Sequence, residues 1–552
     1  MNLLDRYCSN VNALDYDDFS NNTQIKIPDN FNFGYDVVDE YARLTPNKIA
    51  LVWCNDEGEE KIITFGELKV LSDKVCSILL AHNLKKGDFI MTMLGRRYEY
   101  WIIATACHKL GIVLVPATFL LTAKDIEYRC NNADVKLLFV TNQNEVTKHV
   151  IEAIPNCKGL KAVYTHGNID GMINLTNAID NATPMATPPW KTENDDMFLV
   201  YFTSGTTGEP KMVAHKYLYP LGHIITAKFW QDVVDDGLHL TMAESGWAKC
   251  SWGRIYGQWI AGTSIFVYDY FGRFTPTDIL PMIEKYKVTT FCAPPTIYRF
   301  LIKEDLSKYD FSSLTHCSTA GEPLNPEVSK EFTKATGLEI YEGFGQTESS
   351  VLLGTYKFLE IKQGSMGKPS PIYDIYLADN NENEVADGET GEICIKMREN
   401  QLGLLYKYHK DEERTFNTFG SGVYHTGDLA TKDSDGYYWF VGRKDDIIKS
   451  SGYRIGPFEV ESALHEHPAV LECAITGAPD PLRGQVVKAT IVLAKGYSPS
   501  DELTKELQNH VKKATAPYKY PRIVEYVTEL PKTISGKIIR KEIAARDNKK
   551  QG

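Results

Sequence analysis

The sequence lacks any long hydrophobic run. No apolar stretch approaches the ~20 residues that a membrane-spanning helix needs, so we expect no membrane span. The N-terminus also lacks the pattern of a signal peptide, because Asp15, Asp17 and Asp18 follow soon after the first methionine. The 11 cysteines are scattered from Cys8 to Cys473, and no two form a C-x-x-C motif. Their spacing argues against structural zinc or a disulfide framework and favours a reducing compartment, which we expect to be the cytoplasm.

An excess of positive charge is missing too. The chain carries 60 Lys and Arg against 72 Asp and Glu, a net charge of −12. Proteins that bind nucleic acid generally present a basic surface, so the net negative charge argues against a nucleic-acid partner. At 552 residues, with 43% hydrophobic residues, the chain is too long for one core. We therefore expect an enzyme of two or more domains; the sequence leaves a homo-oligomer open.

Strand and helix patterns alternate through most of the chain. Thr64 and Glu67 form a capping box before a helical apolar face, and the apolar run 89–94 follows as a buried strand. Further strands are predicted at 112–116, 135–140, 162–164, 263–268 and 289–293. This alternation predicts parallel sheets covered by helices. From about residue 365 the strands shorten, which predicts a β-rich subdomain, and the polar residues 1–35 are expected on the surface.

A second domain is indicated near the C-terminus. Residues 443–456 are charged and glycine-bearing, as a linker would be, and a small unit of helices and strands follows. The boundaries predicted are 1–444 and 445–552. The expected fold is α/β: a large N-terminal domain of parallel α/β subdomains plus a β-rich subdomain, with a small mobile α+β C-terminal domain.

The segment Thr203 to Lys211 follows a predicted buried strand, Phe198 to Phe202. It combines hydroxyl residues, two glycines and a lysine: T-S-G-T-T-G-E-P-K. Glycine lets the backbone approach a ligand, and N–H groups, hydroxyls and Lys211 can hold phosphate oxygens. The spacing is not the Walker pattern. The alternative is an ordinary polar surface loop.

Four more motifs carry candidate chemistry. In Y-E-G-F-G-Q-T-E, residues 341–348, Glu348 is a candidate Mg²⁺ ligand and Thr347 a donor to an α-phosphate. In Y-H-T-G-D, residues 424–428, Asp428 is a candidate acceptor for ribose hydroxyls. Residues 442–445 with 451–454, and residues 531–537, complete the set. Taken alone, these motifs also have ordinary structural explanations. The second motif could be a solvated turn, Thr-Gly-Asp a β-turn, and Lys537 a solvated surface lysine.

The five motifs, in this order, resemble those of the adenylate-forming superfamily: acyl-CoA synthetases, luciferases and peptide-synthetase adenylation domains. Residues 451–457, 478–484 and 516–521 make the chain most similar to the medium-chain acyl-CoA synthetases. The resemblance implies a ligase that activates a short- to medium-chain or aromatic carboxylic acid with ATP and Mg²⁺. Acyl-AMP and pyrophosphate form first, and the acyl group then passes to CoA. Two alternatives stay open: an adenylation enzyme that loads a carrier protein, and a non-catalytic nucleotide-binding relative.

The resemblance also implies roles for single residues. Catalysis falls to Lys537, Glu348, Thr347 and Lys211, with Glu348 on the metal. ATP binding falls to Thr203, Ser204, Gly205, Thr206, Thr207, Gly208, Lys211, Gly321, Glu322, Pro323, Glu342, Gly343, Phe344, Gly345, Gln346, Thr347, Asp428, Arg443, Arg454 and Lys537. CoA binding falls to Ser451, Gly452, Tyr453, Arg483, Lys512 and Tyr520, and Asp445 is the hinge.

The acyl pocket is implied at Trp247, Gly345 and Thr347. Acetate-specific members of the superfamily place a tryptophan just before Gln-Thr-Glu, where this chain has Gly345. The glycine predicts an open pocket floor and an acid longer than acetate. Residues 250–253, in the stretch that lines the pocket, match the family only loosely, which leaves the substrate undetermined.

Overall fold

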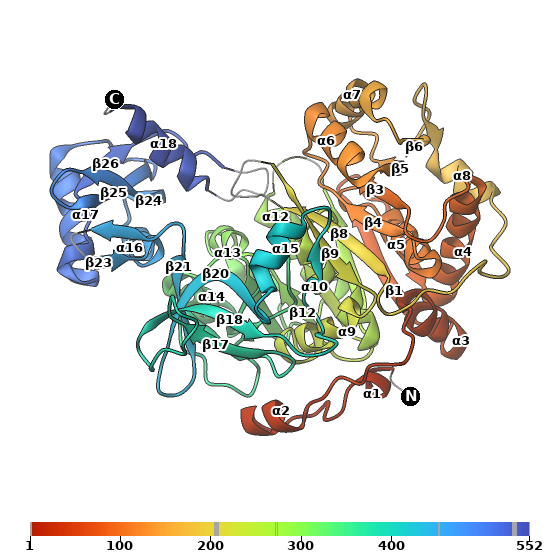
Figure 1. The fold of residues 1–552 in the computed structure, drawn as a ribbon, viewed down its shortest axis with the longest axis horizontal. Helices are drawn as coiled ribbons and strands as arrows, with labels where there is room; N and C mark the ends of the chain where they lie inside the picture. The colour runs from red at the N-terminus through yellow and green to blue at the C-terminus, as the bar shows by residue number, and fades with distance from the viewer. Residues whose placement is uncertain are drawn as a thin grey trace.

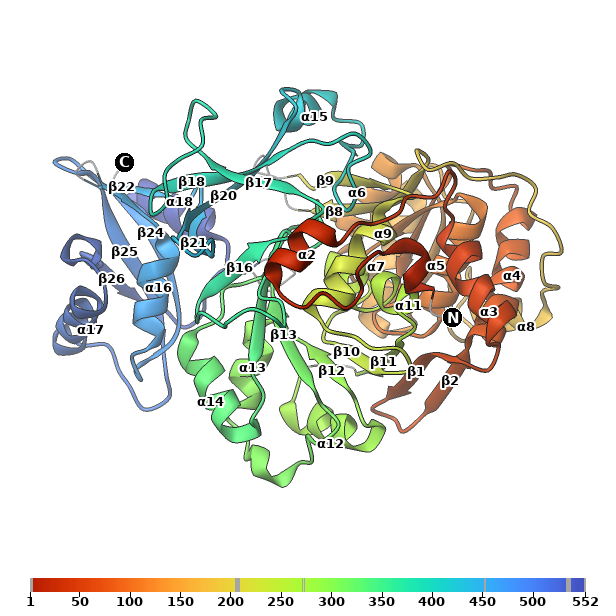
Figure 2. The ribbon, with the colours of Figure 1, turned by 90° about the horizontal axis from the view of Figure 1, so that it is seen from below.

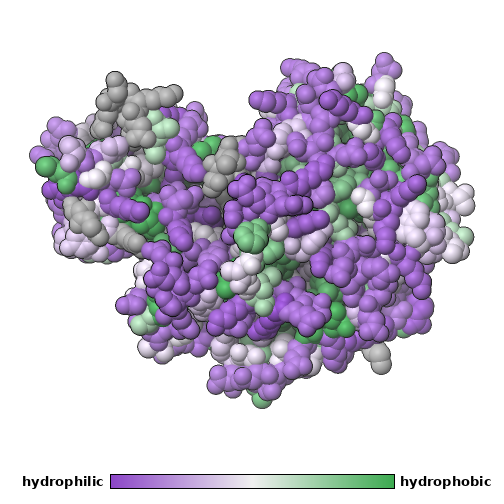
Figure 3. Space-filling model, in the orientation of Figure 1, coloured by the Kyte–Doolittle hydropathy of each residue, from purple (hydrophilic) through white to green (hydrophobic). Residues whose placement is uncertain are grey.

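The computed structural model describes residues 3–203, 209–270, 272, 274–450, 453–532 and 538–550. The described strands form three sheets of thirteen, eight and five strands. Figure 1 shows the five-stranded sheet in a small C-terminal unit beside the other two sheets. A notch separates this unit from the rest on the largely hydrophilic face of Figure 3. Over the described ranges, no helix is long and apolar enough to cross a membrane.

The eight-stranded sheet is parallel from β8 to β7 and carries an antiparallel edge. Its order is β19 (Lys407–Tyr408), β9 (Lys211–Lys216), β8 (Met197–Thr203), β4 (Val113–Pro116), β3 (Phe89–Met93), β5 (Val135–Val140), β6 (Ala162–Thr165) and β7 (Ile173–Asn174). Side chains alternate between two cores along each strand: Ile90 faces one and Met91 the other. Helices α4 (Phe65–Ala81) and α5 (Glu99–Leu110) cover the first face, and α6 (Ala123–Ala133) and α7 (Asn144–Ala153) the second.

The thirteen-stranded sheet joins a parallel half to an antiparallel half. Its order is β17 (Asp374–Ala378), β18 (Thr390–Lys396), β20 (Val423–Lys432), β21 (Tyr438–Arg443), β16 (Ser365–Pro369), β15 (Leu353–Gly354), β14 (Ile340–Phe344), β13 (His316–Ala320), β12 (Thr290–Cys292), β10 (Leu238–Thr241), β11 (Ser264–Asp269), β1 (Ile49–Asn55) and β2 (Glu60–Thr64). Strands β14 to β1 run parallel. Helices α12 (Pro276–Tyr286), α13 (Pro295–Leu301) and α14 (Pro326–Thr336) cover their outer face (Figure 2).

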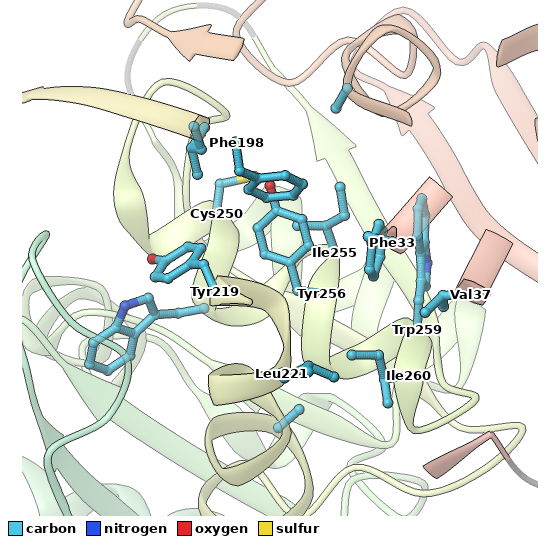
Figure 4. Close-up of a cluster of buried hydrophobic side chains, with 14 of the residues drawn as sticks. Phe33, Val37, Phe198, Tyr219, Leu221, Cys250, Ile255, Tyr256, Trp259 and Ile260 are labelled. Atoms are coloured by element: carbon cyan, nitrogen blue, oxygen red, sulfur yellow. The ribbon is translucent and has the colours of Figure 1, made fainter. Parts of the chain in front are cut away.

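A central core lies between the two large sheets. Figure 4 shows part of it, where Phe33, Phe198, Tyr256 and Trp259 gather from distant parts of the chain. The elements here are η1 (Gly34–Asp39), α3 (Glu40–Leu44), α9 (Tyr219–Ile224), η3 (Ile225–Trp230), α10 (Ala248–Gly253) and α11 (Tyr256–Ile260). This core fixes the two parallel sheets relative to each other and so positions the strand ends that carry the candidate site.

The C-terminal unit has a core of its own. It contains β22 (Ile448–Ser450), β23 (Tyr453–Ile455), α16 (Pro457–His465), β24 (Val470–Asp480), β25 (Gly484–Leu493), α17 (Asp501–Ala514), η5 (Pro517–Lys519), β26 (Ile523–Tyr526) and α18 (Arg540–Lys550). The remaining short elements are α1 (Leu4–Tyr7), α2 (Tyr16–Asn22), η2 (Ile154–Asn156), α8 (Leu175–Asn181), η4 (Leu306–Lys308) and α15 (Glu412–Phe419).

The predicted fold class is confirmed, and the structure adds two details. The β-rich region is continuous with the parallel sheet, because β14, β15 and β16 pair edge to edge and lead into it. The N-terminal segment lies along the outside, but most of its aromatic side chains are buried: Phe19 packs against Phe229 and Tyr356 at 4.7 and 4.6 Å between ring centroids. The segment is thus anchored in the main core rather than laid over the surface.

Candidate active site

Lys211 and Glu348 meet in a buried ion pair. Lys211 begins β9 and Glu348 follows β14, so the contact joins the two large sheets. The Lys211 Nζ lies 2.6 Å from Glu348 Oε1. The Tyr408 hydroxyl lies 3.1 Å from both atoms, accepting from Lys211 and donating to Glu348. Three side chains far apart in sequence therefore form one closed polar cluster.

This cluster keeps the Glu348 carboxylate ionised. Burial by itself would raise the pKa of Glu348, but the charge of Lys211 and its hydrogen bond outweigh burial and hold that pKa below its usual value. The residue Glu348 as a whole is 6% exposed. An ionised, nearly dry carboxylate beside a cation is an oxygen donor of the kind that a hard metal ion accepts.

A second cluster is built around Asp428, on β20. The Gln346 side-chain amide donates to Asp428 Oδ2 at 2.5 Å, and Arg443 Nη1 lies 3.3 Å from Asp428 Oδ1. Tyr424 donates to the Gln346 side-chain oxygen at 2.6 Å and fixes its orientation. Because Gln346 and Glu348 stand two residues apart on one loop, the two clusters share a wall. Thr347, predicted to donate to an α-phosphate, lies between them in the chain, and its backbone oxygen lies 2.9 Å from the buried His215 Nε2.

Glu342 is buried, and no cationic side chain among the described residues pairs with it. It accepts from the backbone N–H of Leu324 at 3.2 Å and of Gly364 at 3.1 Å. Burial raises the pKa of Glu342 to about 8, and the two hydrogen bonds offset this only in part. The bond to Leu324 places the segment Gly321-Glu322-Pro323 against β14, as expected for two motifs that flank one ligand. Gly321 has φ +102°, which favours glycine.

The backbone of the second motif is closely packed on its far side. A Cβ on Gly343 would come within 2.5 Å of the Trp230 ring. A Cβ on Gly345 would come within 2.4 Å of Trp252 Cη2. The expectation of an open pocket floor at Gly345 is therefore wrong, because the Trp252 indole already fills that space. Trp247, also expected at the acyl pocket, is half-buried at the start of α10.

The predicted hinge residue Asp445 lies between β21 and β22. Its carboxylate lies 3.7 Å from Arg443 Nε on one side and 3.9 Å from Lys541 Nζ of α18 on the other. Asp446 likewise faces Arg540 at 3.7 Å. The connection is thus held by ion pairs that reach from the Asp428 cluster to the C-terminal helix.

The candidate CoA residues lie on the C-terminal unit. The Lys512 ammonium lies 4.1 Å from the centre of the Tyr520 ring, and Tyr453 stacks on Tyr518 at 4.1 Å. Arg483 lies in the turn between β24 and β25, where its backbone N–H donates to Asp480. Cations and exposed aromatic rings gather here, a composition that suits a phosphorylated nucleotide.

Some predicted residues lie outside the described ranges: Ser204, Gly205, Thr206, Thr207, Gly208, Ser451, Gly452 and Lys537. Arg454 is the middle residue of β23 (Tyr453–Ile455). Thr203 and Lys211, the two ends of the phosphate motif, are antiparallel partners across β8 and β9. The motif therefore begins and ends at one point of the sheet, next to Glu348.

Sequence reasoning missed Tyr408, Tyr424 and His215. Tyr424 belongs to a motif that was used only for Asp428. Tyr408 stands in no motif, and it reaches Lys211 only because β19 pairs with β9. His215 lies four residues after Lys211 on β9 and so on the same face of the strand. Burial lowers its pKa to about 4, so it is neutral at physiological pH.

Comparison with known proteins agrees with this geometry. The model of the AMP-binding enzyme family matches residues 38–405, and that of the AMP-binding enzyme C-terminal domain matches residues 459–537. The human protein named acyl-coenzyme A synthetase ACSM3, mitochondrial, is 42% identical over 97% of this chain and 93% of its own length. The mouse protein named acyl-coenzyme A synthetase ACSM4, mitochondrial, is 42% identical over 96% and 93%.

Solved structures lead to the same family. The anthranilate CoA ligase AuaEII, in complex with anthranoyl-AMP, has a TM-score of 0.86 at 28% identity and covers 95% of this chain and 99% of its own. A benzoate CoA ligase from Burkholderia xenovorans LB400 has a TM-score of 0.82 at 26% identity, with 93% and 100% covered. The chain belongs to the AMP-binding, adenylate-forming enzymes, within the acyl-CoA synthetases.

Proposed function

We propose that this chain is an AMP-forming acid–CoA ligase whose reaction centre lies where the Lys211–Glu348 pair meets the Asp428 cluster. Its substrates are ATP, a small carboxylic acid and CoA. The reaction forms an acyl-AMP and pyrophosphate, and then an acyl-CoA and AMP. The observation that carries the placement is the pair of clusters on the single loop 346–348, one suited to phosphate and metal and one to a ribose.

Adenylation brings together two negative reactants, a carboxylate and a triphosphate. Lys211 contributes a fixed positive charge, and Glu348 would hold Mg²⁺ through its ionised carboxylate. When bound, Mg²⁺ neutralises phosphate charge and acts as a Lewis acid on the α-phosphate. Tyr408 holds Lys211 and Glu348 in register, so neither has to be ordered when substrates arrive.

Asp428 supplies an acceptor for the ribose hydroxyls. Gln346 and Arg443 fix both carboxylate oxygens, and the group is 4% exposed. Gly321 to Pro323 and Glu342 to Phe344 would flank the adenine, supported by the hydrogen bond between Leu324 and Glu342. Lys537 would bridge the carboxylate and the α-phosphate during adenylation.

The two half-reactions need different partners at one centre. We propose domains of residues 1–444 and 445–552, with rotation about Asp445 alternately presenting Lys537 and the CoA set around Gly452. The separate hydrophobic core of the C-terminal unit supports a rigid-body motion. The ion pairs of Asp445 with Arg443 and Lys541 would break and reform during it.

For the acid we propose a short- to medium-chain or aromatic substrate. Trp252 limits the depth of the space beside Gly345, and the anthranilate and benzoate ligases have aromatic acids in their names. A panel from acetate to octanoate plus benzoate, measured as AMP formation, identifies the substrate. A preference for acetate over all other acids would contradict this choice.

Two other functions predict different outcomes for pyrophosphate release. An acyl-CoA synthetase releases pyrophosphate in one turnover without CoA and continuously with it. An enzyme that loads a carrier protein gains nothing from CoA, and a nucleotide sensor releases none. The ionised Glu348 speaks against a sensor.

For location we propose a reducing compartment. The cytoplasm fits this description, and so do mitochondria, which appear in the names of the relatives. Gel filtration tests for a homo-oligomer.

A further inference from the structure

Three metal-binding residue types meet on the β-rich half of the thirteen-stranded sheet. Cys394 on β18 and His425 on β20 are direct partners across the antiparallel pair. Glu392 precedes Cys394 by two residues, which places it on the same face of the strand. One ligand atom of each side chain lies within 4.8 Å of the others. Cys394 Sγ and Glu392 Oε2 lie 3.4 and 3.3 Å from the same nitrogen, His425 Nδ1.

The surroundings hold these side chains in place. The Gly427 backbone N–H donates to Glu392 Oε1 at 3.0 Å, leaving Oε2 toward the imidazole. Glu382 Oε1 lies 3.2 Å from His425 Nε2, the ring nitrogen that faces away from the cluster. A carboxylate on the far nitrogen is the usual partner of a metal-binding histidine, because it fixes the tautomer and the ring orientation.

We propose that Glu392, Cys394 and His425 bind one divalent cation of the Zn²⁺ class. Thiolate, imidazole and carboxylate together select Zn²⁺ or Co²⁺, and Mg²⁺ prefers an all-oxygen site such as Glu348. On binding, the Cys394 S–H proton leaves to solvent as the metal–sulfur bond forms. Thiolate and carboxylate then balance the two positive charges. Three protein ligands leave a fourth position for water.

Lys444 competes with the metal for Glu392. Its Nζ lies 2.8 Å from Glu392 Oε2, and its side chain is 51% exposed. It can therefore turn into solvent when a metal takes its place. Since Lys444 directly precedes Asp445, occupation of this site changes an ion pair at the start of the proposed hinge. His425 is 26% exposed at the side chain, which gives an ion access from that edge.

Cobalt provides a direct test, because a cobalt–thiolate bond has a charge-transfer absorption that oxygen and nitrogen ligands do not give. Full-length protein is freed of metal with a chelator and titrated with Co²⁺. We expect the band to saturate at one equivalent, and Zn²⁺ to abolish it. Cys394→Ser should lose the band, and His425→Gln should weaken binding strongly. Cys473→Ser is the matched control: Cys473 also lies beside a histidine, His465, at 3.7 Å, but outside any described group of three ligands.

Two further variants distinguish a built site from casual thiol binding. Lys444→Gln should bind Co²⁺ at least about threefold more tightly, because a competing ion pair is gone. Glu382→Asn, which suits the positive φ of 64° at this position, should bind about 10- to 100-fold more weakly. Circular dichroism of the metal-free variants checks their folding. Absence of the band in wild type, or a band that survives in Cys394→Ser, overturns the proposal. So does equal affinity of wild type, Lys444→Gln and Glu382→Asn.

Discussion

Trp252 lies against the Cα of Gly345, so closely that a Cβ at Gly345 would meet its ring at 2.4 Å. The indole is fixed there by a hydrogen bond from its Nε1 to the Ser349 carbonyl at 3.1 Å. In acetate-specific members of the superfamily a tryptophan precedes Gln-Thr-Glu. Here a tryptophan from α10 occupies the neighbouring space instead. The size of the acyl pocket should therefore depend on Trp252 rather than on residue 345.

We predict that Trp252→Leu shifts the preference toward longer or bulkier acids, because it empties space beside Gly345. Gly345→Trp should lose activity toward every acid rather than gain acetate, since Trp252 leaves no room for a second indole. kcat/KM over the carboxylate panel measures both. Trp259→Leu is the control: it also truncates a buried tryptophan bonded to a backbone carbonyl, that of Ala50. A Trp252→Leu profile that overlays wild type, with the protein folded, contradicts the assignment.

Asp428→Ala should raise the KM for ATP by about 10- to 150-fold. The ribose hydroxyls would lose a charged acceptor, and such a hydrogen bond contributes on the order of 1.5–3 kcal/mol. Asp433→Ala is the control. Asp433 directly follows β20, the strand that carries Asp428, and its carboxylate pairs with Lys362, so its loss should leave this KM unchanged. Steady-state kinetics with varied ATP measures both. An unchanged KM in Asp428→Ala removes this residue from the nucleotide site.

Glu342 should make stability depend on pH. Its pKa rises from 4.5 to about 8 on folding, so between these values the folded state holds one more proton than the unfolded state. The free energy of unfolding should therefore fall as pH rises through this window, by up to about 1.4 kcal/mol per pH unit. Glu342→Gln carries no titrating proton and should lack this fall.

Urea unfolding at about pH 5.5 and about pH 7.5 measures the difference. Glutamine keeps only one of the two acceptor oxygens, so the variant also loses about 1–3 kcal/mol at every pH. The diagnostic quantity is the slope with pH, not the offset. Glu339→Gln, at an exposed position just before β14, should retain the wild-type slope. Parallel slopes for wild type and Glu342→Gln mean that Glu342 is ionised in the folded protein.

The elements of the fold were largely readable from local sequence. The capping box at Thr64 does begin α4, and the strand predicted at 135–140 is β5 to the residue. These features depend on neighbours along the chain, where periodicity and capping act. The order of strands in a sheet does not depend on such neighbours. Nothing near β14 in the sequence indicates that β15 and β16 extend the parallel sheet into the β-rich half.

The residues of the candidate site also fall into two groups, those indicated by local sequence and those that only tertiary packing brings in. Short motifs identified Lys211, Glu348 and Asp428, because each stands beside glycines or hydroxyl residues in a recognisable pattern. Tyr408 and Trp252 could not be found that way. Tyr408 acts through strand pairing between β19 and β9, and Trp252 through close contact with a glycine 93 residues later in the chain. Contacts of this kind depend on tertiary packing, which a single sequence does not encode locally.

Asp445 stands at the connection between the two proposed domains. Asp445 lies between Arg443, which contacts Asp428, and Lys541, which belongs to α18. A carboxylate shared between the Asp428 cluster and the C-terminal unit is well placed to respond if that unit turns. Both ion pairs are long and partly exposed, so each contributes little and rotation costs little.

We therefore expect the two half-reactions to separate by mutation. Lys537→Ala should abolish acyl-AMP formation from acid and ATP, yet leave thioester formation from supplied acyl-AMP and CoA largely intact. Gly452→Leu should do the opposite, because a side chain there would block pantetheine. Asp445→Pro fixes φ at the connection and should spare only one half-reaction. Single-turnover pyrophosphate release measures the first step, and thioester formation from synthetic acyl-AMP the second. Loss of both steps in folded Lys537→Ala would mean that the C-terminal domain does not alternate, since a fixed lysine would then serve the whole reaction.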